Sequence, residues 1–458
     1  MKSLKEKCGV FAAWDIPEAS HITYLGLFAL QHRGQEGAGI VCDDGKRFQG
    51  VRGQGLVSQV FSRDAISHLT GDFAIGHVRY STAGGSLAKN LQPLLVEGLG
   101  FEISIAHNGN LTNAVALRRR LEAEGSVFQT SSDTEVILHL VAKTKGDFAT
   151  RLKTALNQVE GAFSLCVMVR EGEKVQIFVI KDRHGFRPLV LGKLGNGYVA
   201  ASETCAFDLV GANFLRELEP GEVVEFSSEG MKSWNLGPAP KPAPCVFEWI
   251  YFSRPDSIVF GESVYEIRKK LGVLLAQEDL KQGFKADLVM GVPDSGIPAA
   301  IGYAQASNLP FEMGLIRNHY IGRTFIEPHQ SIRDFGVRIK QNPLREILKG
   351  KRIVVIDDSL VRGTTSKKIN QILREAGAKE IHMRISAPPT VSPCYYGIDT
   401  PEEKELIASQ KSVAEIGEFI VADSIRYLKM EDVYGFLKPK SSMCDACFTK
   451  NYPVAVSN

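Results

Sequence analysis

VVIDDSLVRGTTS, residues 354–366, runs from an apolar strand into a polar loop and then into the start of a helix. The strand ends in two carboxylates, Asp357 and Asp358, and the loop holds one glycine and three hydroxyl residues. Amides at a helix N-terminus, together with the hydroxyls of Thr364 and Thr365, suit a phosphate. The two carboxylates suit ribose hydroxyls or a hydrated Mg²⁺, which prefers oxygen ligands. The plainer alternative is an acidic strand end before a capped helix, but two adjacent aspartates with this turn favour a phosphosugar site.

Short apolar strands alternate with helices on both sides of this stretch. Ser263 and Glu266 form a capping-box pattern, and the helix that they open carries apolar residues along one face. Strands are expected at 287–292 and 352–356, and a helix at 365–376. This alternation predicts an α/β domain with a parallel sheet covered on both faces. The polar stretch 323–349 has weak periodicity and predicts a functional loop or disorder.

The first half of the chain follows another pattern. Strands are expected at 8–14, 73–78, 103–106, 164–169 and 175–180, and helices at 22–31, 114–123 and 134–142. This mixture predicts layered α/β packing with largely antiparallel sheets. The proline-rich stretch 237–244 reads as an extended spacer and marks a domain boundary. A chain of 458 residues is expected to hold two or more domains.

Composition narrows the classes of function. A hydrophobic content of 44% and a charged content of 23% are typical of a soluble globular protein. The net charge of +2 gives no electrostatic reason to expect nucleic acid or a membrane as partner. No apolar run approaches the ~18 residues needed to span a bilayer. Eight cysteines without a secretory signal indicate the reducing cytoplasm, where thiols serve as core residues, nucleophiles or metal ligands.

Cys8 follows a short polar leader, residues 1–7, which reads as a propeptide. A cut before Cys8 would free an α-amino group with a pKa of about 7.7–8.0. Such an amine can take the proton of the thiol on the same residue, as in enzymes with an N-terminal nucleophile. The alternative is that Cys8 is a small apolar residue at the start of an ordinary strand.

Four polar, glycine-punctuated clusters follow Cys8, at 32–39, 77–82, 107–110 and 132–135. In this order they resemble the class II, N-terminal-nucleophile glutamine amidotransferase domain, a four-layer α/β/β/α sandwich. Glutamine recognition needs a cation for the α-carboxylate and a carboxylate for the α-ammonium, which Arg79 and Asp133 supply. The oxyanion of the thioester-forming step needs donors, which the Asn108 side chain and the Gly109 amide supply.

The stretch 354–366 resembles the signature of the type I phosphoribosyltransferases, which bind phosphoribosyl pyrophosphate (PRPP). A second match, at 291–296, is similar to the pyrophosphate-side loop of that family, although Gly296 stands where close relatives often carry a metal-binding serine. The acidic pair is expected to hold Mg²⁺. The resemblance implies a PRPP site formed by Ser295, Lys340, Asp357, Asp358, Ser359, Arg362, Gly363, Thr364 and Thr365, with Lys340 reaching the diphosphate after loop closure.

The pair Cys444 and Cys447 forms a CxxC motif, and Cys245 and Cys394 lie far upstream. Four thiolates from three segments suit Zn²⁺ or a 4Fe–4S cluster, and their number does not separate the two. The remaining cysteines lie in apolar stretches and are expected to be core residues: Cys42, Cys166 and Cys205.

The whole chain resembles the glutamine phosphoribosylpyrophosphate amidotransferase family. The resemblance implies transfer of ammonia from glutamine to C1 of PRPP through an internal channel, giving 5-phosphoribosylamine, glutamate and pyrophosphate, the first committed step of purine synthesis. One branch has a cleaved propeptide and a 4Fe–4S cluster, whose ligands match Cys245, Cys394, Cys444 and Cys447. Feedback inhibition by purine nucleotides and a homotetramer are also implied.

The expected division is a propeptide (1–7), a glutaminase domain (8–235), a linker (236–250), a phosphoribosyltransferase domain (251–390) and a C-terminal segment with the cluster ligands (391–458). Two other classes of protein share part of this pattern. A glucosamine-6-phosphate synthase shares the first half but lacks the segment 354–366. A non-catalytic purine sensor keeps the PRPP site but needs a basic DNA-binding segment, which the sequence does not contain.

Overall fold

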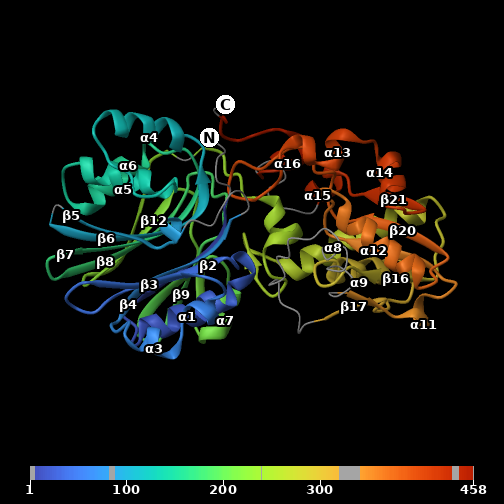
Figure 1. Cartoon of the computed structure of the whole chain (residues 1–458), viewed down its shortest axis with the longest axis horizontal. Coiled ribbons are helices and arrows are strands. Elements are labelled where there is room, and N and C mark those ends of the chain that lie inside the picture. The colour runs from blue at the N-terminus through green and yellow to red at the C-terminus, as the bar shows by residue number, and fades with distance from the viewer. Residues whose placement is uncertain are drawn as a thin grey trace.

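The computed structural model describes residues 6–81, 88–98, 100–238, 240–318, 341–435 and 443–456. Two bodies lie along the long axis of the molecule, the first drawn from blue to green and the second from yellow to red (Figure 1). Lys340 and most of the expected loop at 323–349 lie outside the described residues, as does most of the leader.

The first body contains two antiparallel sheets. In the described chain one sheet has seven strands in the order β11-β9-β10-β1-β4-β2-β3, and the other has six in the order β13-β12-β8-β7-β6-β5. The strands of the first sheet are β1 (Glu6–Trp14), β2 (Gly37–Asp43), β3 (Phe48–Gln54), β4 (Phe73–Ser81), β9 (Val190–Leu194), β10 (Gly197–Ala201) and β11 (Asn213–Glu217). Those of the second are β5 (Leu94–Gly98), β6 (Phe101–Leu111), β7 (Gly161–Glu171), β8 (Lys174–Lys181), β12 (Glu222–Ser227) and β13 (Gly230–Asn235).

Helices cover the outer faces of both sheets. The helices on the first sheet are α1 (Ala19–Ala29), η1 (Gln31–Arg33), α2 (Val57–Val60), α3 (Arg63–Ser67) and α7 (Cys205–Val210). Those on the second are α4 (Ala114–Ala123), α5 (Thr134–Lys143) and α6 (Phe148–Leu156), with the short η2 (Ala88–Asn90) nearby in the chain.

Strand β1 shows why the body is layered. Side chains alternate between the faces of a strand, so Val10, Ala12 and Trp14 pack between the two sheets while Phe11 and Ala13 pack under α1 and α7. The result is the α/β/β/α sandwich that the sequence predicted. Cys42, Cys166 and Cys205 are buried in its cores, which confirms their expected role.

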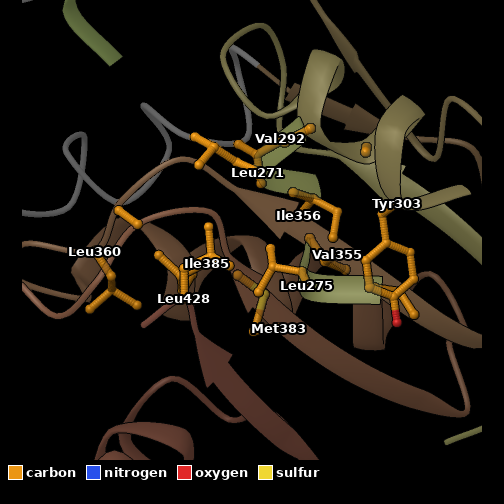
Figure 2. Close-up of a cluster of buried hydrophobic side chains, with 14 of the residues drawn as sticks. Leu271, Leu275, Val292, Tyr303, Val355, Ile356, Leu360, Met383, Ile385 and Leu428 are labelled. Carbon is orange, nitrogen blue, oxygen red and sulfur yellow. The ribbon is translucent and has the colours of Figure 1, made fainter. Parts of the chain in front are cut away.

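The second body is built around a four-stranded parallel sheet in the order β16-β19-β20-β21. The strands are β16 (Leu288–Gly291), β19 (Arg352–Asp357), β20 (Glu380–Ile385) and β21 (Ser424–Tyr427). The flanking helices are α8 (Val264–Lys281), α9 (Ile297–Ser307), α12 (Thr364–Glu375) and α14 (Val413–Phe419). Figure 2 shows Leu271 and Leu275 of α8 beside Val355, Ile356 and Met383 of the sheet, a core that buries the sheet as predicted.

Ser263 caps α8, and its hydroxyl accepts a hydrogen bond from the backbone N–H of Glu266 at 3.4 Å, as the capping-box pattern indicated. The smaller elements are η3 (Glu248–Phe252), β14 (Ile258–Val259), β15 (Glu262–Ser263), β17 (Leu315–Arg317), β18 (Gln341–Pro343), α11 (Arg345–Leu348), η4 (Glu403–Glu405), α13 (Ile407–Gln410), α15 (Met430–Tyr434) and α16 (Ala446–Thr449).

Residues 341–349 differ from the sequence-based expectation. They form β18, which pairs with β17, and the helix α11, whose Leu348 is fully buried. The prediction of an unstructured stretch was therefore wrong for this end of it. A three-residue strand paired with a distant segment leaves no periodic pattern in the sequence.

Candidate active sites

Cys8 lies at one end of the space between the two sheets of the first body. In the pairing of β1 with β4 it stands opposite Arg79. Alternation along β1, β4 and β6 places Cys8, Arg79 and Asn108 on the faces that look into this space. All three residues are buried, with at most 1% of their surface exposed. The structure therefore brings the expected nucleophile, cation and oxyanion donor to one place.

Ser202, which follows β10, ties the nucleophile strand to Asn108. Its hydroxyl accepts a hydrogen bond from the backbone N–H of Val10 at 3.0 Å and one from Asn108 Nδ2 at 3.5 Å. Its own backbone N–H donates to the carbonyl of Val10 at 3.0 Å. Sequence reasoning missed Ser202 because its partners are distant in the chain.

Only glycine fits at position 109. Its φ is +155°, and a Cβ atom at this position would lie 2.0 Å from the carbonyl oxygen of Ala162. A side chain here would force β6 away from β7, so the position requires glycine.

Asp133 precedes α5 and is anchored to β6. Its Oδ2 accepts a hydrogen bond from the backbone N–H of Leu111 at 2.8 Å, and its Oδ1 lies 3.7 Å from His107 Nδ1. Burial favours the neutral acid, yet the neighbouring His107 and the hydrogen bonds hold the pKa of Asp133 below its ordinary value. The carboxylate that should meet an ammonium is therefore ionised.

The second candidate site lies at the carboxyl ends of β16 and β19. Asp357 is the last residue of β19 and Asp358 follows it, and Ser295 from the loop after β16 hydrogen-bonds the Asp358 carboxylate. The Ser359 hydroxyl donates to Asp358 Oδ1 at 2.6 Å. Burial, and for Asp357 also the charge of Asp358, raises the pKa of both carboxyls. The charged form of both groups is therefore disfavoured in the protein alone, and a cation bound between them would favour it.

Gly296 has no room for the serine that some relatives were expected to carry. A Cβ atom there would lie 2.3 Å from the carbonyl oxygen of Ile356 and 2.9 Å from the backbone nitrogen of Val292. The loop after β16 is packed directly on the end of β19. A side chain at this position would separate Ser295 from Asp358.

The loop 359–365 leads into α12 with its hydroxyls at the surface. Thr364 and Thr365 are exposed at the first turn, and Gly363 precedes them with a φ of +72°. The Arg362 guanidinium, by contrast, donates to Glu405 Oε2 at 2.7 Å and is half-exposed. The structure thus brings together the acidic pair, Ser295 and the two threonines, while the Arg362 side chain is held by Glu405.

Comparisons with known proteins agree with this arrangement. A glutamine amidotransferase domain model matches residues 77–208, and a phosphoribosyl transferase domain model matches residues 262–402. Amidophosphoribosyltransferase 1, chloroplastic, of Arabidopsis thaliana is 54% identical over 98% of this chain and 79% of its own. Amidophosphoribosyltransferase of Bacillus subtilis is 49% identical over 100% of this chain and 96% of its own. The chain belongs to the amidophosphoribosyltransferase family.

Solved structures of amidophosphoribosyltransferases share the whole fold. The B. subtilis glutamine PRPP amidotransferase complexed with ADP and GMP is 48% identical, with a TM-score of 0.91, and the match covers 98% of each chain. A structure of the allosteric regulatory enzyme of purine biosynthesis is 49% identical over 98% of this chain and 97% of its own, with a TM-score of 0.93. The predicted fold class and enzyme class are confirmed: a glutamine-dependent transferase of purine biosynthesis.

Three segments of the chain bring the four remaining cysteines toward one another. Cys245 and Cys444 form a parallel bridge, in which the Cys444 N–H donates to the Pro244 carbonyl at 2.9 Å. The Cys447 carbonyl accepts from the backbone of Val391 and Ser392 at 2.9 and 3.1 Å, which brings the CxxC turn to the segment of Cys394. Burial first, and then the other three thiols, raise the pKa of Cys447 well above its ordinary value.

No three His, Cys, Asp or Glu side chains within the described ranges gather closely enough to hold one metal ion. No helix in the same ranges combines the length and apolar character needed to cross a bilayer.

Proposed function

We propose that Cys8 releases ammonia from glutamine and that this ammonia displaces pyrophosphate from C1 of PRPP at Asp357 and Asp358. The observation that supports this most directly is the pairing of Cys8 with Arg79 beneath Asn108, at the end of the space between the sheets. A thiol, a cation and an amide donor in a closed apolar setting suit attack on a carboxamide.

In the first reaction the amine of Cys8 takes the thiol proton, and sulfur bonds to the side-chain amide carbon of glutamine. Asn108 Nδ2 and the Gly109 N–H donate to the oxyanion, while Arg79 and Asp133 hold the α-carboxylate and α-ammonium. The Cys8 ammonium then gives the thiol proton to the amide nitrogen, the C–N bond breaks, ammonia leaves, and water hydrolyses the thioester to glutamate and restores the thiol. The amine exists only after the bond between residues 7 and 8 is cut, so removal of the leader is part of the proposal.

In the second reaction ammonia attacks C1 of PRPP and pyrophosphate leaves, giving 5-phosphoribosylamine. The 5-phosphate meets the first turn of α12 at Thr364 and Thr365, with Ser359, Arg362 and Gly363 alongside. Ser295 would face the diphosphate, and Lys340, which lies outside the described residues, stays a predicted diphosphate contact. We propose a closed passage between the sites, because ammonia is mostly protonated and non-nucleophilic in neutral water.

The acidic pair suits Mg²⁺. Mg²⁺ is usually held by one or two carboxylates together with water and substrate phosphates, so the lack of a third protein ligand is no obstacle. Asp357 and Asp358 would hold it, and when bound it would offset the negative charge that raises their pKa and neutralise the departing pyrophosphate.

The four converging cysteines suit a structural 4Fe–4S cluster better than zinc. These thiols lie close enough for their charges to act on one another, and the branch of the family whose ligand contexts they match carries a 4Fe–4S cluster. Cys245, Cys394, Cys444 and Cys447 would hold the cluster, which would join the C-terminal segment to the junction of the two domains.

Purine nucleotides are proposed as feedback inhibitors, since a relative is described in complex with ADP and GMP. A homotetramer and a cytoplasmic location are proposed from the family resemblance and the free thiols. The division into propeptide, glutaminase domain, linker, phosphoribosyltransferase domain and cluster-bearing segment keeps the boundaries given above.

Pyrophosphate release tests the function. The anaerobically purified enzyme, with its N-terminus checked by intact mass, should release pyrophosphate from PRPP and Mg²⁺ with either glutamine or ammonium as donor. Equal failure with both donors would contradict the proposal.

Ser202→Ala should lower kcat for glutamine hydrolysis by about 10-fold, because Asn108 and the backbone of Val10 lose a shared partner. The KM for glutamine should change little, since Arg79 and Asp133 are untouched. Initial-rate assays of glutamate release give both constants. The ammonium-dependent reaction serves as the internal control, and a KM effect without a kcat effect would contradict the assigned role.

Cys394→Ala should lose iron, acid-labile sulfide and visible absorption, because one cluster ligand is missing. Cys166→Ala is the matched control, since Cys166 is buried in the first body far from the other cysteines along the chain. Metal analysis after anaerobic purification provides the measurement. A colourless parent protein that contains zinc would overturn the cluster assignment.

A further inference from the structure

The short segment 394–398, in the last part of the chain, packs against the end of β6. Gly397 has a φ of +92°, and a Cβ atom there would lie 2.8 Å from the carbonyl carbon of Gly109 and 2.9 Å from its Cα atom. The next residue of β6, Asn110, donates a hydrogen bond from Nδ2 to the backbone carbonyl of Tyr395 at 2.8 Å. The proposed oxyanion donor and its neighbour therefore both contact a segment that lies 285 positions further along the chain.

The Gly109 backbone has little space in which to move away from Gly397. A Cβ atom on Gly109 itself would lie 2.0 Å from the carbonyl oxygen of Ala162 on β7. In the pairing of β6 with β7, Gly109 stands opposite Phe163 and Asn110 stands opposite Ala162. A group added at position 397 would therefore have to displace a backbone that is already paired within its sheet.

The segment 394–398 is itself held in place on several sides. Arg187 of the first body donates from Nε and Nη2 to the Tyr396 carbonyl at 3.0 and 2.6 Å. The Phe186 ring stacks on the Tyr396 ring, with centroids 4.3 Å apart. The Tyr396 hydroxyl donates to the Val454 carbonyl at 2.7 Å and accepts from the Val454 N–H at 3.0 Å. A buried segment fixed in this way offers a rigid surface to the end of β6.

An oxyanion donor depends on such support. It acts only where its N–H lies about 2.7–3.1 Å from the oxygen on which negative charge develops. A displacement of about 1 Å can cost about 100-fold in rate. Glycine is the residue with the widest backbone freedom, so its position has to be fixed by its neighbours. The contact with segment 394–398 supplies this restraint to Gly109.

We propose that Gly397 and Asn110 are positioning residues for glutamine hydrolysis, which fix the Gly109 backbone so that its N–H meets the oxyanion. This inference rests on the proposed function, since Gly109 is an oxyanion donor only if Cys8 attacks a carboxamide. Both residues act through Gly109 rather than on glutamine itself. Through Gly397, the glutaminase site includes a segment far beyond residues 77–208, which the amidotransferase domain model matches.

The test is glutamate release by Gly397→Ala at saturating PRPP and Mg²⁺. The added methyl group displaces the Gly109 backbone, so kcat should fall by at least about 10-fold, a part of the 100-fold or more that loss of a whole donor costs. The KM for glutamine should stay within about 2-fold of the parent, because Arg79 and Asp133 are unchanged. Ammonium-dependent pyrophosphate release should stay within the same limit.

Alkylation of Cys8 by iodoacetamide separates misplacement of the oxyanion donor from damage to the nucleophile. This reaction needs the thiol but forms no oxyanion on a carbonyl carbon. Its rate, followed by mass spectrometry of the peptide that contains Cys8, should be the same in Gly397→Ala and in the parent. A role in general packing would lower this rate together with kcat.

Asn110→Ala is the second variant, because it removes one hydrogen bond and adds no backbone strain. It should lower kcat by about 5-fold, again with little change in KM or in Cys8 alkylation. Gly45→Ala is the matched control. Gly45, in the turn after β2, has a φ of +88°, close to that of Gly397, but a Cβ atom there meets nothing within 4 Å. It should keep the parent's kcat.

A kcat at the parent's level in both Gly397→Ala and Asn110→Ala would overturn the proposal. An equal fall in kcat, in Cys8 alkylation and in ammonium-dependent release would also overturn it. If Gly397→Ala does not fold, Asn110→Ala decides by the same criteria. A parent inactive with both glutamine and ammonium would instead contradict the proposed function itself.

Discussion

Cys8→Ala should lose glutamine-dependent pyrophosphate release by more than about 1,000-fold and keep ammonium-dependent release within about 2-fold of the parent. The reason is that sulfur is the atom that bonds to the amide carbon, and alanine offers no nucleophile. The proposed PRPP site lies in the other domain, on a sheet that shares no strand with the one that carries Cys8. Ammonia supplied from solution therefore bypasses the missing step.

The measurement is pyrophosphate release with each donor in turn, on protein whose intact mass shows the N-terminus. Cys166→Ala is the control, because it removes another fully buried thiol from the same body. Protein that keeps residues 1–7 should behave like Cys8→Ala, since its residue 8 has a peptide nitrogen in place of an amine. Loss of both reactions in a folded Cys8→Ala protein would contradict two separate sites.

Local patterns in the sequence predicted local structure well. The helix α4 spans residues 114–123 as expected, and β1, β4, β6, β7 and β8 each contain the strand predicted for them. The helix α4 is buried on one face only, whereas strands such as β1 and β7 are buried on both faces and appear as short apolar runs, and both patterns are recorded by neighbouring residues along the chain. The acidic pair and the loop before α12 were also found, because strand, loop and helix are consecutive.

Contacts between distant segments were not predictable in this way. Ser202 and Val10 are 192 positions apart, and Arg33 and Glu248 are 215 apart. Nothing in the residues around Arg33 indicates that a glutamate from the domain junction will meet it. Such contacts form only when the whole chain has folded, and they leave no pattern in the residues next to either partner.

The lack of space at Gly296 illustrates the same limit. The sequence showed a departure from a family pattern and suggested a lost metal ligand. The structure shows instead that the backbone of β19 occupies the place of any side chain there. The acidic pair therefore carries the proposed Mg²⁺ site with Ser295 beside it, which makes substitution at these aspartates the stronger test.

Asp358→Asn should lose pyrophosphate release with both donors by at least about 100-fold. The amide keeps the shape of the carboxylate but not the charge that holds Mg²⁺, and loss of one member of the pair leaves a single carboxylate at the site. Basal glutamate release should continue, because Cys8 and its neighbours are unchanged. Asp287→Asn is the control, since Asp287 lies at the amino end of β16, away from the carboxyl ends that form the site, and pairs with Arg352.

Melting temperatures distinguish the loss of activity in Asp358→Asn from unfolding of the variant. The pKa of Asp358 is raised in the folded protein, so its ionised form favours the unfolded chain at any pH above its ordinary pKa. Asparagine removes that charge and also relieves Asp357, so Asp358→Asn should melt at the same temperature as the parent or higher when Mg²⁺ is absent. Added Mg²⁺ with PRPP should raise the melting temperature of the parent but not that of the variant. An unstable variant, or one that Mg²⁺ and PRPP stabilise as strongly as the parent, would contradict the assignment of Asp358 to the metal.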